Sequence, residues 1–188
     1  MKDYNIIING IGGQGLITLL KIISEAANSE GCDVRTSELH GLSQRGGSVE
    51  VYIRFGEKIY SPLVARGKAD LVISLEEQES LNGLYFSNQN TNFLVNKYRT
   101  PTFTQDVPEE EVLVSLKKAS SNVSLVPASE ICQKELGTDV VSGIYLLGLA
   151  ISKNLLPLKK ESIVSAIKKI IPEKFLELNL KTLELAKN

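Results

Sequence analysis

The sequence contains no tryptophan, a single histidine (His40) and two cysteines, Cys32 and Cys132. An ordinary iron–sulfur cluster takes four thiolates, and a zinc site takes about four clustered ligands, so neither centre is expected within this chain. The two cysteines lie far apart and show no C-x-x-C spacing. They are therefore interpreted as small buried apolar residues rather than as a disulfide pair.

The sequence also lacks a large net charge of either sign. Lys and Arg number 21 and Asp and Glu 22, for a net charge of −1. This balance gives no general attraction to nucleic acid or to an anionic membrane, so neither is expected as a partner. No apolar run reaches the roughly 18 residues of a membrane span, and the first residues do not resemble a signal peptide. We expect a cytoplasmic protein.

The first third of the chain predicts a sheet and a helix. Residues 4–9 form a short apolar run typical of a buried strand, and residues 16–28 have helical apolar spacing. Residues 33–36 follow as a second strand, which predicts a βαβ unit with a right-handed crossover. Residues 48–55 alternate between apolar and polar, as in a half-exposed strand. The turn signal at residues 56–57 predicts a hairpin with residues 58–60, and hence a mixed sheet.

The rest of the chain alternates between strands and helices and then becomes helical. Strands are predicted at residues 69–75, 92–96 and 123–126, and helices after Pro108 and at residues 128–136, 140–152, 161–170 and 173–186. The helix at residues 140–152 is apolar nearly all round, so it is either central in the core or covered by a partner. We expect a single three-layer α/β/α domain over residues 1–188, with a mixed, mainly parallel sheet and a helical C-terminal end.

A glycine-rich loop, GIGGQG, lies between the first strand and the first helix. Gly10, Gly12 and Gly15 match the G-x-G-x-x-G dinucleotide fingerprint, while Gly13 and Gln14 are unusual for a plain nucleotide loop. A helix start offers free N–H groups to an anion, and Glu38 lies about where a ribose-binding acid would. Nucleotide binding, a purely structural tight turn, and binding of another anion or of a partner backbone all remain open.

A second glycine-rich loop follows the second strand. It holds polar side chains between glycines, namely His40, Ser43, Gln44 and Arg45 before Gly46 and Gly47. Arg45 is a candidate for binding a carboxylate or phosphate, and the alternative is a solvated loop whose glycines serve turns. His40 is interpreted as a surface or hydrogen-bonding residue rather than a catalyst, and no metal site is predicted.

The two loops, together with Tyr60-Ser61-Pro62-Leu63 and residues 172–180 (PEKFLELNL), resemble the gamma-type domain of the pyruvate and ketoisovalerate ferredoxin oxidoreductase family. Within that family, the small subunit of the indolepyruvate enzymes is similar over nearly the whole chain. The resemblance implies oxidative decarboxylation of a 2-oxoacid, an aryl pyruvate here, to an acyl-coenzyme A, with electrons passed to ferredoxin. It implies a heteromer that is inactive without a larger partner.

The resemblance also assigns the cofactors. Thiamine diphosphate and [4Fe–4S] clusters would lie on the larger subunit, and coenzyme A would be a co-substrate. No catalytic residue is expected in this chain. The residues expected to face a cofactor or the partner are Gly10, Gly12, Gly13, Gln14, Gly15, Glu38, His40, Ser43, Gln44, Arg45, Gly46 and Gly47.

Two other classes of function remain possible from the residues alone. A small nicotinamide- or flavin-dependent dehydrogenase would use the first loop and Glu38, but the chain shows no catalytic tyrosine–lysine pair near a second loop. A non-enzymatic binding module would use the loops without turnover. Tight dinucleotide binding would favour the first, and co-purification with a partner lacking thiamine would favour the second.

Overall fold

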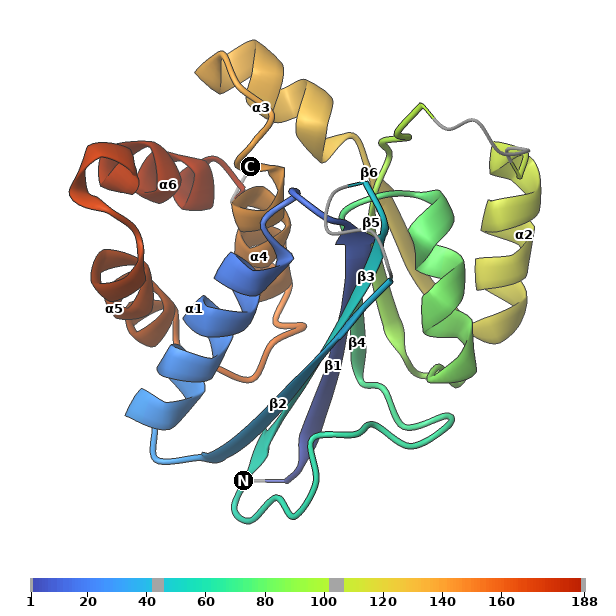
Figure 1. Cartoon of the computed structure of the whole chain (residues 1–188), viewed down its shortest axis with the longest axis horizontal. Helices are drawn as coiled ribbons and strands as arrows, with labels where there is room; N and C mark the ends of the chain where they lie inside the picture. The colour runs from blue at the N-terminus through green and yellow to red at the C-terminus, as the bar shows by residue number, and fades with distance from the viewer. Residues whose placement is uncertain (1, 42–45, 102–106, 187–188) are drawn as a thin grey trace.

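The computed structural model describes residues 2–41, 46–101 and 107–186. Its centre is a six-stranded sheet in the order β2-β3-β1-β4-β5-β6 (Figure 1). The strands are β1 (Tyr4–Ile11), β2 (Asp33–His40), β3 (Ser48–Gly56), β4 (Leu71–Ser74), β5 (Asn92–Asn96) and β6 (Asn122–Val126). β1 pairs in parallel with β4, and the parallel pairing continues through β5 to β6. β3 is antiparallel to both of its neighbours, so the predicted mixed, mainly parallel sheet is confirmed.

Three expectations for the first half of the chain are wrong. β2 does not lie beside β1, because β3 is inserted between them, so β1, α1 and β2 do not form a simple βαβ unit. The hairpin joins β2 to β3, and residues 58–60 form no strand. β3 is central rather than half-exposed, and its polar-looking face is covered, since Glu50 and Tyr52 are both buried.

Helices cover both faces of the sheet. α1 (Leu16–Ser29), α4 (Ser142–Ser152), α5 (Lys160–Ile170) and α6 (Glu173–Leu185) gather on one face in Figure 1, and α2 (Glu109–Ala119) with the 3₁₀ helix η1 (Gln78–Tyr85) lies on the other. Successive side chains of a strand point to opposite faces. Ile6 and Ile8 accordingly pack into the core under α1 and α4, and Ile7 packs into the core under α2 and η1. This is the predicted three-layer α/β/α arrangement.

Glycine or proline marks one limit of several helices. Gly15, before α1, has φ 85°, and Gly137, after α3 (Ala128–Leu136), has φ 75°, values that favour glycine. α2 begins after Pro108 with three glutamates in its first turn and ends with two lysines, which suits the helix dipole. The predicted C-terminal helices are confirmed, while η1 was not foreseen.

The apolar helix α4 is central in the core of this chain. Seven of its residues, from Gly143 to Ala150, are buried. Gly148 lies against α6, where a Cβ atom would come 2.6 Å from Ala186 Cβ and 3.0 Å from the Leu183 carbonyl oxygen. The glycine therefore permits close packing of the two helices. Of the two predicted alternatives, a helix in the core or a helix covered by a partner, the core position is confirmed.

Candidate site at the glycine-rich loops

The first glycine-rich loop lies at the carboxyl end of β1 and leads into α1. Gly13 (φ 108°) and Gly15 (φ 85°) adopt backbone conformations that L side chains rarely reach. Gly15 is the N-cap of α1, which has no side-chain cap and no acidic residue in its first turn. The positive end of the helix dipole is therefore not neutralised by its own first turn, an arrangement that favours an anion.

Gln14 closes this loop with its own side chain. Its Oε1 accepts a hydrogen bond of 2.8 Å from the backbone N–H of Ile11. A Cβ atom at Gly10 would lie only 2.7 Å from that Oε1, so glycine at position 10 makes room for the Gln14 amide. The Gln14 side chain thus helps to shape the loop.

The second glycine-rich loop joins β2 to β3 and meets the first loop. The N–H of Gly12 donates a 2.9 Å hydrogen bond to the carbonyl oxygen of Gly47, and Gly41 N–H donates to Ser48 O at 3.2 Å. The structure therefore brings the two predicted loops together at one end of the sheet. Gly46 has φ 73°. Ser43, Gln44 and Arg45 lie outside the described residues.

Glu38 and His40 lie together on β2, away from the first loop. The His40 Nε2 atom is 3.1 Å from Glu38 Oε2, and both side chains are exposed to solvent. In a doubly wound sheet, the ribose-binding acid lies at the end of the second strand, and that strand pairs directly with the first. Here β3 separates β2 from β1, at about 4.8 Å per strand, which places Glu38 two strands away from the first loop.

An apolar cavity of about 290 Å³ opens beside the first loop. Its walls come from the starts of α1, α4 and α6, and include Gln14, Thr18, Val140, Phe175 and Asn179. Asn179 is buried, and its side-chain amide donates a hydrogen bond of 2.8 Å to the Phe175 carbonyl oxygen. The cavity therefore suits an apolar chain or group carrying a few polar atoms.

A smaller hollow of about 130 Å³ lies on the other side of Gln14, lined by Tyr98, Ser129, Asp139 and Ser142 among others. These side chains are polar, whereas those of the first cavity are mostly apolar. Gln14 borders both spaces. The loop therefore lies between the apolar cavity and the smaller hollow, whose side chains can form hydrogen bonds.

A third hollow of about 480 Å³ lies on the opposite face of the sheet, between β3, the end of β2 and η1. Glu50 lines it together with the exposed Leu39 and Tyr85. Burial raises the pKa of the Glu50 carboxyl, and a hydrogen bond from the Tyr52 hydroxyl opposes part of that rise. The alternating pattern of residues 48–55 predicted Glu50 and Tyr52 to be exposed, so neither was a candidate site residue.

The cysteines do not fit a metal cluster. Cys132 is fully buried, and burial raises the pKa of its thiol to about 11; burial also raises the pKa of the Cys32 thiol. These two thiols are fewer than the four thiolates of an ordinary iron–sulfur cluster. Among the residues that the structure describes, no three His, Cys, Asp or Glu side chains gather as metal ligands. In that same part of the chain, no helix is both long and apolar enough to cross a membrane.

Two cavity residues were missed although a signal for them was present. Phe175 and Asn179 lie four residues apart on α6 and so share one face of the helix. Both belong to the stretch PEKFLELNL, which was used only for the family resemblance. An asparagine between two leucines of a predicted amphipathic helix was the feature that could have pointed to a polar group beside the core.

The fold is that of the gamma-type subunits of 2-oxoacid:ferredoxin oxidoreductases. The keto/oxoacid ferredoxin oxidoreductase gamma subunit from Geobacter sulfurreducens superposes with a TM-score of 0.72 at 21% identity, covering 98% of this chain and 96% of that one. The 2-oxoglutarate:ferredoxin oxidoreductase from Magnetococcus marinus, solved with 2-oxoglutarate, coenzyme A and succinyl-CoA bound, gives 0.75 at 17% identity. This chain covers only 31% of that larger one, with all of its own length matched.

The sequence gives the more specific assignment. Residues 5–188 match the family model described as pyruvate ferredoxin/flavodoxin oxidoreductase, and the chain belongs to this family. The indolepyruvate oxidoreductase subunit IorB of Archaeoglobus fulgidus is 37% identical over 190 residues, covering 98% of this chain and 94% of that protein. The predicted resemblance is thereby confirmed.

Proposed function

We propose that this chain is the small, cofactor-poor subunit of an indolepyruvate-type 2-oxoacid:ferredoxin oxidoreductase. The observation that carries the proposal is the 37% identity to the Archaeoglobus fulgidus IorB subunit across nearly the full length of both proteins. The assembled enzyme would decarboxylate an aryl pyruvate oxidatively, form the acyl-coenzyme A and pass electrons to ferredoxin.

The cofactors are assigned to a larger partner subunit. Two thiols cannot supply the four thiolates of a [4Fe–4S] cluster, so the clusters would reside on the partner. We assign the thiamine diphosphate to the same partner on the basis of the family resemblance. Electrons would reach ferredoxin through that partner. The small chain would then contribute a binding surface beside the active site and no redox centre.

The end of the sheet with the two glycine-rich loops is the face that we assign to the partner's active site. Gly12 and Gly47 join the loops there, and Gly15 leaves the start of α1 accessible to an anion. The residues assigned to this face are Gly10, Gly12, Gly13, Gln14, Gly15, Glu38, His40, Ser43, Gln44, Arg45, Gly46 and Gly47. None of them is assigned as a catalytic acid, base or nucleophile.

Coenzyme A is the co-substrate that best fits the surroundings of the first loop. The apolar cavity of about 290 Å³ lies beside the uncapped N-terminus of α1, so an apolar arm and an anionic group could be held next to each other. The Magnetococcus marinus enzyme, whose fold includes a matching domain, was solved with coenzyme A bound.

Anaerobic purification of the tagged chain from its native extract tests the proposal. The eluate is assayed for thiamine diphosphate, iron–sulfur absorbance and reduction of a viologen dye by pyruvate, phenylpyruvate and indolepyruvate. A large iron–sulfur partner with activity on the two aryl pyruvates is the expected result. Activity on pyruvate alone would contradict the substrate class, and a solitary chain that binds a dinucleotide would contradict the whole proposal.

A further inference from the structure

We propose that the segment Tyr60-Ser61-Pro62-Leu63, here the Tyr60–Leu63 platform, is a docking surface for an acidic, partly apolar face of the larger subunit. The inference rests on the proposed function, because it assumes that such a subunit exists. The platform is the one motif of the family resemblance that the glycine-rich site leaves without a role.

The platform presents large apolar side chains to solvent. Tyr60 is 83% exposed and Leu63 is 62% exposed, whereas Ile59 and Val64 on either side are buried at 2% and 5%. The buried pair anchors the segment in the protein, and the exposed pair points outward without cover from the described part of this chain. Exposed tyrosine anchors of this kind often dominate the binding energy of protein interfaces.

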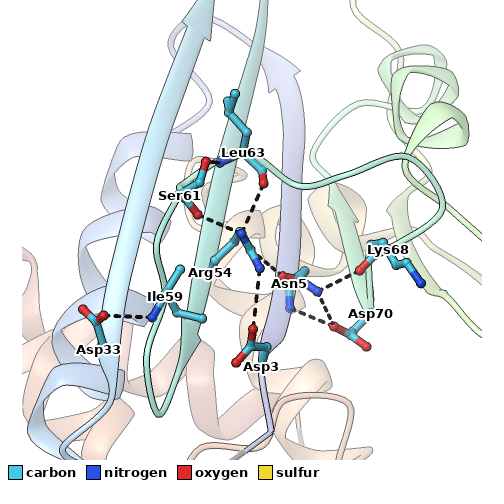
Figure 2. A network of polar contacts seen from close by, with 9 residues as sticks. All are labelled: Asp3, Asn5, Asp33, Arg54, Ile59, Ser61, Leu63, Lys68 and Asp70. Carbon is cyan, nitrogen blue, oxygen red and sulfur yellow. Dashed lines mark hydrogen bonds and ion pairs between the residues drawn. The ribbon is translucent and has the colours of Figure 1, made fainter.

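The platform is held in place although it belongs to no helix or strand. Figure 2 shows Arg54 of β3 at its centre, where Nη1 donates to the Ser61 carbonyl oxygen at 2.9 Å and, less closely, to that of Leu63 at 3.4 Å. The Ile59 N–H is bound by Asp33 Oδ2 at 2.9 Å, and the Leu63 N–H by Ser61 Oγ at 3.2 Å. A surface ordered before binding loses less conformational entropy when a partner docks.

A second set of contacts fixes Arg54 itself. Its Nε donates to Asn5 Oδ1 at 2.8 Å, and the Asn5 amide in turn donates to Asp70 Oδ2 and to the Lys68 carbonyl oxygen (Figure 2). The first residues of β1, the end of β3 and both ends of the connection to β4 are thereby linked. This network orders the backbone beneath the exposed side chains of Tyr60 and Leu63.

Charge favours an acidic partner. Between β3 and β4 the exposed charged residues are Lys58, Arg66 and Lys68 against the single acid Glu57. The other acids beside the platform already have cationic or N–H partners: Asp3 pairs with Arg54, Asp33 with Arg35 and the Ile59 N–H, and Asp70 with Asn5. The ammonium of Lys58 lies 5.1 Å from the centre of the Tyr60 ring, so positive charge adjoins the apolar anchor. Carboxylates on the partner would complement this surface and speed association.

The platform and the glycine-rich loops lie at opposite ends of the sheet. Arg54 pairs with Asn5 at the start of β1, and Val49 pairs with Gly10 near its end. These positions are five residue steps apart along the strand, a distance of about 17 Å. Docking through the platform would therefore leave the loop end free to face the partner's active site. Substitutions in the platform should alter partner binding, and substitutions in the loops should alter activity.

Titration of the purified chain into its purified, cofactor-loaded partner tests the inference, with viologen reduction and direct binding both recorded. We expect Tyr60→Ala and Leu63→Ser to raise the concentration needed for half-maximal activity by about 10- to 30-fold, with an unchanged plateau. Lys58→Glu should weaken binding at low salt and less so at high salt. Val114→Ser, at an exposed valine of α2, is the matched control and should leave the titration unchanged.

The outcomes separate the inference from the proposed function. Wild-type chain that neither binds nor activates the partner overturns both. Wild-type activation that is matched by Tyr60→Ala and Leu63→Ser overturns only the docking surface. A lowered plateau with unchanged half-saturation also overturns it, because that places the residues in the chemistry. Loss of self-association of the chain in ultracentrifugation on Tyr60→Ala, without loss of partner binding, assigns the surface to a second copy and overturns the inference. Melting temperatures confirm that each variant is folded.

Discussion

Gly12 donates its backbone N–H to the carbonyl oxygen of Gly47 across 2.9 Å, and this bond joins the two glycine-rich loops. Neither partner uses a side chain, so the contact depends on how closely the two backbones approach. The first loop is thus supported from β3 as well as from β1 and α1. A substitution in either loop is therefore expected to alter the conformation of the other loop.

Gly10→Ala should destabilise the first loop through Gln14. The new Cβ would lie 2.7 Å from Gln14 Oε1 and 3.2 Å from Leu75 Cβ, so we expect a loss of about 1–3 kcal/mol in the free energy of unfolding. In a Gln14→Ala background the nearer obstruction is absent, and the loss should shrink by about 1 kcal/mol. Urea unfolding of the four proteins measures this coupling, and strictly additive effects would contradict it.

Arg45→Ala should lower the activity of the assembled enzyme while the subunit remains folded. An arginine that binds a carboxylate or phosphate contributes charge-assisted hydrogen bonds, so a decrease of about tenfold in kcat/KM is expected. Arg35→Ala is the control, since Arg35 is exposed and paired only locally, with Asp33 at 2.6 Å. An assembled Arg45→Ala enzyme with full activity would disprove the role of Arg45.

Glu50→Gln should stabilise the protein at neutral pH but not in acid. The folded state raises the Glu50 pKa above its usual 4.5, mainly through burial, so the folded protein holds this proton more tightly than the unfolded chain. Stability from this group is therefore complete below pH 4.5 and is lost as the pH rises through the folded pKa. The melting temperatures of the two proteins, measured between pH 4 and 9, should differ more as the pH rises. Glu57→Gln, at an exposed position, is the matched control.

Gly148→Ala should cost more stability than Gly143→Ala. The Cβ at position 148 would meet the backbone and Cβ of α6, which can shift only as a unit, so a loss of about 1–3 kcal/mol is expected. At position 143 the nearest atom is Leu19 Cδ1 at 3.1 Å, the end of a flexible side chain. There the helix preference of alanine, about 0.5–1 kcal/mol, should offset much of the strain. Equal losses in denaturant unfolding would argue against this packing.

The sequence predicted those elements whose signals are local. α3 and α6 were found because Gly137 and Pro172 mark their limits, and the buried strands because their apolar runs are short and bounded. β2 was predicted too short, since an edge strand exposed through most of its length has little apolar periodicity to detect. The place of β3 between β1 and β2 depends on pairings between distant residues, and no local pattern carries that information.

The same distinction holds for the site. The glycine-rich loops could be predicted because a tight turn before a helix has a sequence signature. Their hydrogen bond could not, because it joins two separate turns whose meeting depends on the strand order. The cavity beside them is formed by α1, α4 and α6, so Thr18 and Phe175 meet only in the folded chain. Arg45, Gln44 and Ser43 remain predictions.

The central position of β1 has a consequence for protein synthesis. β1 pairs with β3 and β4, and its contact from Asn9 to Ser74 spans 65 residues. At about 5–20 residues per second, the first strand is made several seconds before its second neighbour exists. During this interval its three consecutive isoleucines, which are fully buried in the finished protein, have at most β3 to pair with and lack β4 on the other side. The nascent chain is therefore expected to be most dependent on chaperones before β4 has left the ribosome.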